Sequence, residues 1–337
     1  GILLSMGIGY PIPEFIIVLP MGISFYAFQA SAYTIDVYRG KIKPLKHYGK
    51  FSLFISFFPQ LVAGPIERSQ NLIPQFFKRH YPDFERTIMG LKIMLWGYFK
   101  KVVIADRAAI AVNTIFNSCE SYSGLYYVIA LILFTFQIYC DFSGYSDIAV
   151  GSAKIMGFNL MRNFDRPFFS TRIKEFWRNW HISLSTWFTD YVYIPLGGNR
   201  VSKIKHYRNL IVTFLLSGLW HGSAWTFVIW GGLHGLYLVV GEITLPFRTR
   251  VKEFLHIQNS VVMKFFEIII TFALVAYAFI FFRANSFQDA IYIINHILWD
   301  FRMWLEPQYL YEVFTNMGLN IYELIVVSSA IMIMLFE

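Results

Sequence analysis

Charged residues and cysteines are scarce in this sequence. Asp, Glu, Lys and Arg together make up 15% of its 337 residues, whereas a soluble domain averages about 25%. The shortage predicts that most of the protein surface does not face water. The two cysteines, Cys119 and Cys140, have no CxxC spacing, so the sequence implies neither a disulfide framework nor a cysteine metal site.

Several motifs of catalysis and targeting are also missing. No HxxxH or HxxE pair offers metal ligands, no GxSxG elbow marks a serine nucleophile, and no glycine-rich loop is suited to a phosphate. The chain starts at Gly1 without a basic segment, so no signal peptide is visible. We therefore expect no bound metal and no bound cofactor.

The net charge of +8 fits membrane topology better than nucleic-acid binding. Lysines and arginines gather between apolar runs, as the positive-inside rule predicts for cytoplasmic loops. Attraction of the same bases to an acidic carrier or to CoA phosphates is the alternative. The clusters span residues 39–50, 68–107, 162–178, 200–208 and 248–252.

Long apolar runs dominate what the sequence does contain. A helix needs about 20 largely apolar residues to span a bilayer, so we predict an all-α polytopic membrane protein with one membrane domain over residues 1–337. The start at Gly1 and the end directly after an apolar run lead us to expect missing helices at the N-terminus and a short C-terminus. The runs are Phe15–Tyr33, Tyr126–Tyr139, Leu210–Trp220, Phe265–Phe282 and Ile321–Phe336.

Two apolar stretches are too short or too interrupted to span. Residues 51–66 contain two prolines and a glycine, which predicts a re-entrant or interfacial hairpin that is buried in protein or lines a cavity. Leu210–Trp220 covers 11 residues, or roughly 16 Å of helix, which is about half a hydrocarbon core. His221 follows directly, so we expect it near mid-membrane depth beside a helix break.

The stretch of residues 162–208 is polar but rich in aromatic side chains. Four of its residues recur at positions i, i+4, i+7 and i+11, which predicts one amphipathic interfacial helix over Lys174–Tyr191 with all four on one face. They are Trp177, His181, Leu184 and Phe188.

Two histidines, His181 and His221, stand in tryptophan-rich apolar sequence. Each is either a core histidine with a satisfied hydrogen bond or a functional group, because burial of an ionisable ring is costly. Asp141 is likewise either a functional residue of a span or a partner in a hydrogen bond between helices. A neutral imidazole can take a proton from an acceptor hydroxyl as that oxygen attacks an acyl group, which accelerates transfer about 10²–10⁴-fold.

Three stretches together resemble the membrane-bound O-acyltransferase superfamily, in particular its alginate-type polysaccharide branch. They are FFPQLVAGPIER at 57–68, EFWRNWHISLS at 175–185 running on to GGNR at 197–200, and LWHG at 219–222 running on to HG at 234–235. The segments LPMGISF at 19–25 and 141–151 are also similar. The order and spacing of these motifs carry the resemblance, which covers nearly the whole chain.

The resemblance implies a bowl of tilted helices, with re-entrant and interfacial helices, around a central tunnel. His221 matches the essential histidine of the superfamily, and His181 matches a second polar residue upstream. His234 matches a histidine of the alginate-type branch alone. The possible supporting residues are Trp177, Trp180, Trp187 and Trp220, which would shape the tunnel, together with Asp141 and Asn199.

The implied reaction is transfer of an acyl group, acetyl in this branch, from acetyl-CoA or an acylated carrier protein on the cytoplasmic side. The acceptor would be a hydroxyl of an extracytoplasmic polysaccharide, or a partner acyltransferase, at the cytoplasmic membrane of a bacterium. Two alternatives stay open. D-alanyl transfer to teichoic acid shares the WHxSLS-like stretch, and a small-solute transporter would also carry intramembrane carboxylates, such as Asp141 and Asp147, and broken helices.

Overall fold

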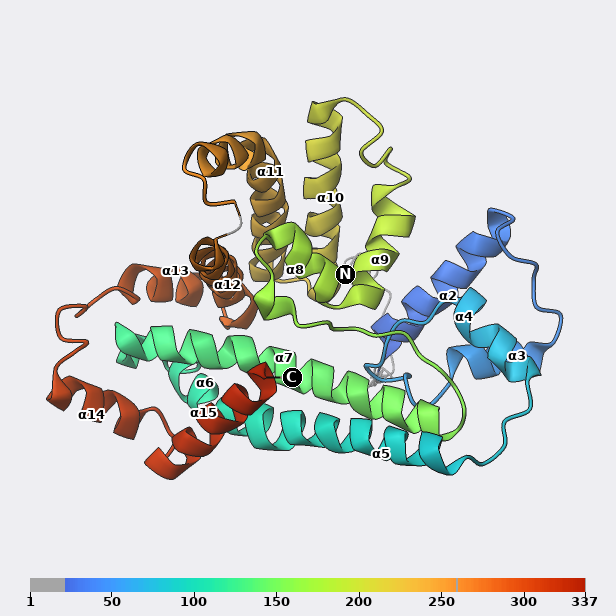
Figure 1. The fold of residues 1–337 in the computed structure, drawn as a ribbon, viewed down its shortest axis with the longest axis horizontal. Helices are drawn as coiled ribbons and strands as arrows, with labels where there is room; N and C mark the ends of the chain where they lie inside the picture. The colour runs from blue at the N-terminus through green and yellow to red at the C-terminus, as the bar shows by residue number, and fades with distance from the viewer. Residues whose placement is uncertain (1–21, 259, 337) are drawn as a thin grey trace, which may run out of the picture.

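The computed structural model describes residues 22–258 and 260–336, and every regular element within them is helical (Figure 1). This confirms the predicted all-α class. Residues 19–21 of the LPMGISF segment and the first part of the run from Phe15 lie outside the described residues.

The described α-helices range from one turn to 31 residues in length. They are α2 (Ile23–Tyr38), α3 (Tyr48–Ile55), α4 (Ser69–Leu72), α5 (Phe84–Tyr98), α6 (Asp106–Phe116), α7 (Leu125–Ile155), α8 (Ile173–Asn179), α9 (Ile182–Phe188), α10 (Lys203–His221), α11 (Trp225–Phe254), α12 (Val261–Arg283), α13 (Phe287–His296), α14 (Pro307–Asn316) and α15 (Ile321–Leu335). Shorter 3-10 and π segments are η1 (Ile73–Phe77), η2 (Phe99–Ala105), η3 (Cys119–Ser121), η4 (Pro167–Phe169) and η5 (Thr189–Tyr193).

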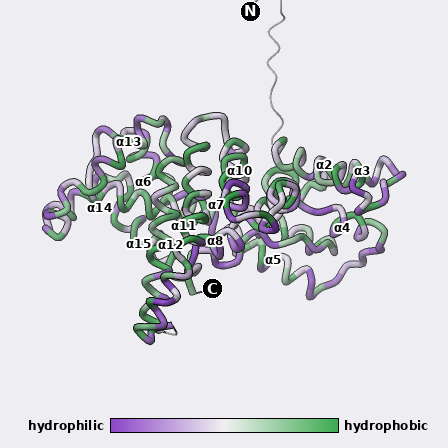
Figure 2. Tube along the Cα trace, turned by 90° about the horizontal axis from the view of Figure 1, so that it is seen from above, coloured by the Kyte–Doolittle hydropathy of each residue, from purple (hydrophilic) through white to green (hydrophobic). Residues whose placement is uncertain are grey.

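Three of the described helices, α7, α11 and α12, are long and apolar enough to cross a bilayer. The pair α14 and α15, bent by 88°, adds a fourth if the two form one broken span. Hydrophobic residues run along much of α12 and α15 in Figure 2, where α2 to α4 lie at one end of the molecule and α13 and α14 at the other. The protein is therefore a polytopic membrane protein, as its composition predicts.

Glycines bring α5 and α7 into backbone contact. A Cβ added to Gly144 would lie 2.7 Å from the Gly97 carbonyl oxygen, and one added to Gly151 would lie 2.6 Å from that of Gly90. Small residues at these positions let the two helices approach closely. The path of α5, η2 and α6 consequently runs along α7, within reach of its polar side chains (Figure 1).

The helix break predicted after His221 is present. α10 ends at His221, Gly222 is extended (φ 173°), and α11 starts at Trp225 and packs back against α10. A Cβ on Gly231 would overlap the Phe214 carbonyl, so the two helices touch closely at that level. α10 starts at Lys203, however, so the apolar run forms only its second half.

The single helix predicted over Lys174–Tyr191 is wrong. The chain forms α8 and α9 with His181 between them in the left-handed region (φ 43°). Asn163 explains the break, because its carbonyl accepts from Ile182 N at 2.8 Å and its side-chain oxygen accepts from Ser183 Oγ at 2.6 Å. These bonds from a distant loop hold the start of α9 in place of a continuous helix.

The hairpin predicted over residues 51–66 corresponds to the end of α3 and a helix-free stretch at 56–68. Gln60 in this stretch is 3% exposed and donates to the Gln29 side chain on α2 at 2.9 Å. The residue before Gln29, Phe28, also holds α2, because its ring stacks on that of Trp187 at 3.9 Å. The irregular backbone is thus buried between α2 and the rest of the protein.

Candidate active site

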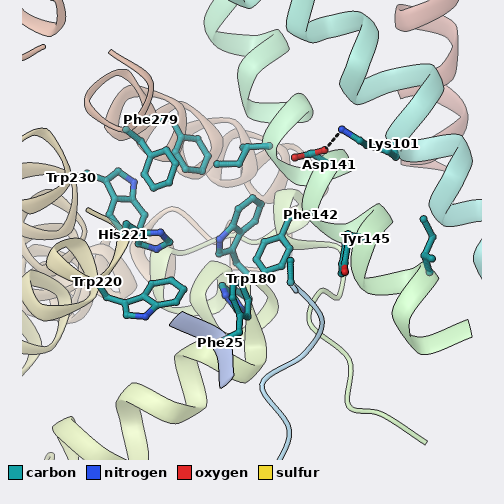
Figure 3. Close-up of a pocket in the computed structure, with 15 residues that line it drawn as sticks. Phe25, Lys101, Asp141, Phe142, Tyr145, Trp180, Trp220, His221, Trp230 and Phe279 are labelled. Atoms are coloured by element: carbon teal, nitrogen blue, oxygen red, sulfur yellow. Dashed lines mark ion pairs between the residues drawn. The ribbon is translucent and has the colours of Figure 1, made fainter. Parts of the chain in front are cut away.

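A cavity of about 330 Å³ lies between α2, α7, the α8–α9 break and the ends of α10 and α11 (Figure 3). Its walls are largely aromatic, with a few polar groups, which is the usual make-up of a small-molecule site. We call it the histidine cavity. It is lined by Phe25, Ala63, Lys101, Ile138, Asp141, Phe142, Tyr145, Ile148, Trp180, His181, Trp220, His221, Trp230, Phe279 and Phe282.

His221 enters the cavity from the last residue of α10. Its half-buried ring lies edge-on to three aromatic rings, those of Trp220 at 4.8 Å, Trp230 at 5.0 Å and Phe282 at 5.2 Å between centroids. The helix break places the ring at an open end instead of inside a helical turn. The aromatic rings fix its orientation and leave its nitrogens available to a ligand in the cavity.

His181 enters the same cavity from the break between α8 and α9. Its ring meets Phe142 edge-on at 4.6 Å and lies 6.3 Å from that of Phe25. Burial lowers the pKa of His181 well below its ordinary value, and the nearby His221 lowers it further. The neutral ring is therefore the favoured form.

Neither ring nitrogen of His181 has a hydrogen-bond partner among the described residues, although the residue is only 2% exposed. The indole nitrogens of Trp220 and Trp230 in the same walls also lack partners there. Buried polar groups are nearly always paired, so each exception calls for an explanation. A polar molecule that occupies the cavity would supply the partners.

The predicted tryptophans divide between several places. Trp180 and Trp220 line the histidine cavity. Trp177 donates from Nε1 to His234 Nδ1 at 3.2 Å, and His234 is fully buried. Trp187 stacks on Phe28 outside the cavity and donates to its carbonyl at 3.0 Å, so it holds α2 in position.

Asp141 lies at the side of the histidine cavity away from His221, where it pairs with Lys101 at 2.7 Å (Figure 3). Asn199 is exposed and does not line the histidine cavity. Within the described residues, no three side chains of His, Cys, Asp or Glu form a group that could hold a metal ion.

A second cavity, of about 200 Å³, runs along one face of α10. Lining residues on α10 recur at helical spacing from His206 to Ser217, over about 16 Å at 1.5 Å per residue, and end one turn before His221. Its charged and hydroxyl-bearing residues are Lys174, Arg178, Ser185, Thr189, Tyr193, His206, Thr213, Ser217 and Glu242, and its apolar ones are Trp177, Leu184, Phe188, Leu210, Phe214 and Leu238.

A chain of polar contacts closes one side of the second cavity. Glu242 contacts Lys174 Nζ at 3.0 Å and His206 Nε2 at 2.7 Å, and Tyr193 OH lies 2.9 Å from His206 Nδ1. Sequence reasoning missed this group and also Lys101. The spacing of His206, Leu210, Thr213 and Ser217 along one helix face was the available signal.

A wall of three rings stands between the two cavities. Trp177 lines the second cavity and Trp230 lines the histidine cavity, with 5.7 Å between their ring centroids. His234 contacts both, at 4.9 Å from Trp177 and 5.0 Å from Trp230. His234 therefore lies in the partition and not beside His221 and His181 in the open cavity.

The fold and the cavity shared by His181 and His221 define a helical membrane protein with an aromatic-walled internal cavity. Residues 46–287 match the model of the membrane-bound O-acyltransferase family. The chain belongs to this family.

The named relatives include proteins that transfer acetyl groups and one that transfers D-alanyl groups. A probable alginate O-acetylase of Azotobacter vinelandii is 47% identical over 224 residues, covering 66% of this chain and 44% of the relative. A peptidoglycan O-acetyltransferase of Helicobacter pylori is 38% identical over 305 residues, covering 83% and 56%. A teichoic acid D-alanyltransferase of Streptococcus thermophilus is 30% identical over 240 residues, covering 67% and 57%. The chain thus spans about half the length of these relatives.

Proposed function

We propose that this chain carries the catalytic core of an O-acyltransferase of the bacterial cytoplasmic membrane, which transfers acetyl from a thioester to a hydroxyl of an extracytoplasmic polysaccharide. One observation carries the proposal. His181, at the break between α8 and α9, and His221, at the end of α10, line one cavity, and both nitrogens of the buried His181 ring lack partners among the described residues.

In the proposed mechanism His221 is the general base. Its neutral imidazole takes the proton of the acceptor hydroxyl while that oxygen attacks the carbonyl carbon of the thioester. The C–S bond breaks, the sulfur leaves as a thiolate and takes the proton back from the imidazolium, and the products are an ester and a thiol. His181 orients the acceptor or stabilises the developing charge, and the aromatic walls keep water from the thioester.

The second cavity is the proposed route of the acyl donor. Lys174, Arg178 and His206 at this cavity belong to basic clusters that the positive-inside rule assigns to the cytoplasm. The cavity then offers hydroxyl groups along α10 and ends one turn before His221, behind the wall of Trp177, His234 and Trp230, so in this proposal the wall opens to let the thioester reach His221. A phosphopantetheine arm has the matching chemistry, with a phosphate at one end, amides along its length and a thioester at the other, and both acetyl-CoA and an acylated carrier protein possess it.

Two finer points belong to the proposal: which acyl group is transferred, and whether it reaches the polymer directly. The relatives include a D-alanyltransferase and a peptidoglycan O-acetyltransferase. The transferred group is acetyl in the preferred version, which the higher identity to two O-acetylating relatives supports. The acyl group passes to the polymer directly or through a partner acyltransferase. Mass spectrometry of the modified polymer separates acetyl from D-alanyl, because the two groups add different masses.

Replacement of His221 tests the proposal. His221→Ala should lower acetyl transfer in native membranes by about 10²–10⁴-fold, because it removes the base, while the amount of protein in the membrane stays unchanged. His181→Ala should impair transfer less, and His234→Ala less again. Wild-type transfer rates in His221→Ala would overturn the assignment of the base.

A further inference from the structure

The second cavity contains a carboxylate, although the proposed route through it carries an anionic donor. Glu242 on α11 lines the cavity together with Lys174 and Arg178, the two groups suited to a phosphate. A carboxylate at this place repels the phosphate, and it takes no part in the proposed chemistry. Its contacts point to a different task.

Glu242 joins two other helices at the end of the second cavity that is farther from His221. One carboxylate oxygen pairs with Lys174 Nζ on α8 at 3.0 Å, and the other contacts His206 Nε2 on α10 at 2.7 Å. The side chain of Lys174 is 58% exposed. Exposed ion pairs are weak, so a phosphate that enters here is able to take the lysine from Glu242.

The same short helix supplies one ring of the wall between the two cavities. Trp177 follows Lys174 by about one turn of α8, and its Nε1 donates to His234 Nδ1 at 3.2 Å. The other side-chain nitrogens of the wall, His234 Nε2 and Trp230 Nε1, have no partner among the described residues. Two polar contacts therefore fasten α8 to α11, one at the wall and one at the outer end of the cavity.

Of the two sides of this wall, α8 is the less firmly held. Trp230 and His234 lie on the long helix α11, and each precedes a glycine at which α11 meets α10. A Cβ on Gly235 would lie 3.1 Å from Ile211 Cα. By contrast, α8 has seven residues and ends at the left-handed turn of His181. Release of α8 from α11 would thus open the wall on the α8 side.

We propose that Glu242 makes acyl transfer depend on the phosphate of the donor. Without a phosphate the carboxylate holds Lys174, and α8 keeps Trp177 in the wall. A phosphate at Lys174 and Arg178 takes the lysine from Glu242, which releases α8 and opens the wall to the thioester. We call the Lys174–Glu242 pair the latch. This inference rests on the proposed function, and it is the same whether the acyl group passes to the polymer or to a partner protein.

The latch has a kinetic signature. A phosphate that only adds binding energy lowers the KM for the donor and leaves kcat unchanged, whereas a phosphate that opens the wall raises kcat. Acetyl-phosphopantetheine and acetyl-pantetheine are matched donors, because they differ in the phosphate alone. In permeabilised native membranes, with labelled acetyl on polymer and protein counted together, wild-type kcat should be about fivefold higher for acetyl-phosphopantetheine, as expected for one exposed ion pair.

Glu242→Gln tests the latch, because glutamine keeps the size of the side chain and loses the charge that holds Lys174. It should raise kcat for acetyl-pantetheine about fivefold, so that the two donors react at similar rates. Lys174→Gln should raise this kcat likewise, and it decides the matter if Glu242→Gln does not reach the membrane. Glu267→Gln is the matched control and should keep the wild-type preference, since Glu267 pairs with Lys252 between α12 and α11 at 2.6 Å and does not line the second cavity.

Three outcomes would count against these inferences. Equal wild-type kcat for the two donors, or the same preference in Glu242→Gln as in Glu267→Gln, would overturn the latch. Transfer from acetyl-CoA or an acetylated carrier protein, without transfer from acetyl-phosphopantetheine, would also overturn it, because the phosphate would then not suffice to open the wall. Absence of transfer from every one of these thioesters would instead overturn the proposed function.

Discussion

Trp187 is expected to control how well α2 seals the histidine cavity. Its ring is parallel to that of Phe28 within 2° at 3.9 Å, its indole nitrogen donates to the Phe28 carbonyl at 3.0 Å, and the residue is 8% exposed. Phe25, one turn earlier on α2, lines the cavity and contacts His181 and Trp220. Loss of the Trp187 contact should therefore loosen the wall that Phe25 forms.

The magnitude follows from the contacts that each substitution removes. Trp187→Ala deletes a buried tryptophan, which costs about 3–5 kcal/mol. Trp187→Phe keeps a ring for stacking, worth about 0.5–1.5 kcal/mol, and loses one hydrogen bond of about 0.5–1.5 kcal/mol. Since about 1.4 kcal/mol is a factor of ten in an equilibrium, the alanine variant should shift the docking of α2 by well over tenfold and the phenylalanine variant by about tenfold or less.

Two measurements check this reasoning. The unfolding temperature in detergent should fall clearly in Trp187→Ala and slightly in Trp187→Phe. Because a looser wall admits water to the thioester, the ratio of free acetate released to ester formed should rise in the same order. Trp225→Ala, at a tryptophan that is 75% exposed, is the control. The reasoning fails if Trp187→Ala matches that control in both measurements.

Two further predictions concern the hairpin and the donor route. Burial raises the pKa of Glu67 from 4.5 to about 7. The stability that the protonated side chain contributes is therefore complete below pH 4.5 and is lost as the pH rises through about 7, with a fall in the free energy of unfolding of at most roughly 3 kcal/mol. Unfolding temperatures measured from pH 4 to pH 8 should fall in the wild type and stay level in Glu67→Gln. Arg178→Gln at the second cavity should raise the KM for the acyl donor about tenfold, because a charge-assisted contact with the donor phosphate is lost. Lys205→Gln is the control, since Lys205 is exposed outside the cavity, and it should leave the donor KM unchanged. Equal effects of the two substitutions would mean that the basic cluster sets membrane topology and does not bind the donor.

Features that depend on local sequence could be predicted. The apolar runs at 126–139, 265–282 and 321–336 correspond to α7, α12 and α15, because a long apolar run is helical in a membrane whatever it packs against. The break after His221 followed from a run, Leu210–Trp220, that is too short to span a bilayer. Both inferences need only neighbouring residues.

The pairing of Lys101 with Asp141 could not be predicted in this way. Lys101 stands in a basic cluster, where topology is a sufficient explanation for its charge, and its partner lies 40 residues later. The contact depends on glycines that bring α5 against α7 and on a π-helical turn that redirects the lysine. Neither the glycine contact nor the wider helical turn has a signature in the periodicity of apolar residues.

The break at His181 shows how one wrong local inference changes the site. A continuous helix places Trp177, His181, Leu184 and Phe188 on one face. In the structure the left-handed turn at His181 sends its ring into the histidine cavity, while the other three residues line the second cavity. The bonds from Asn163 that impose this turn come from a loop outside the helix. Without that turn, His181 would stay on the same helix face as Trp177 and would line the second cavity, the proposed donor route. The placement of His181 in the histidine cavity therefore depends on Asn163, which the helical spacing does not include.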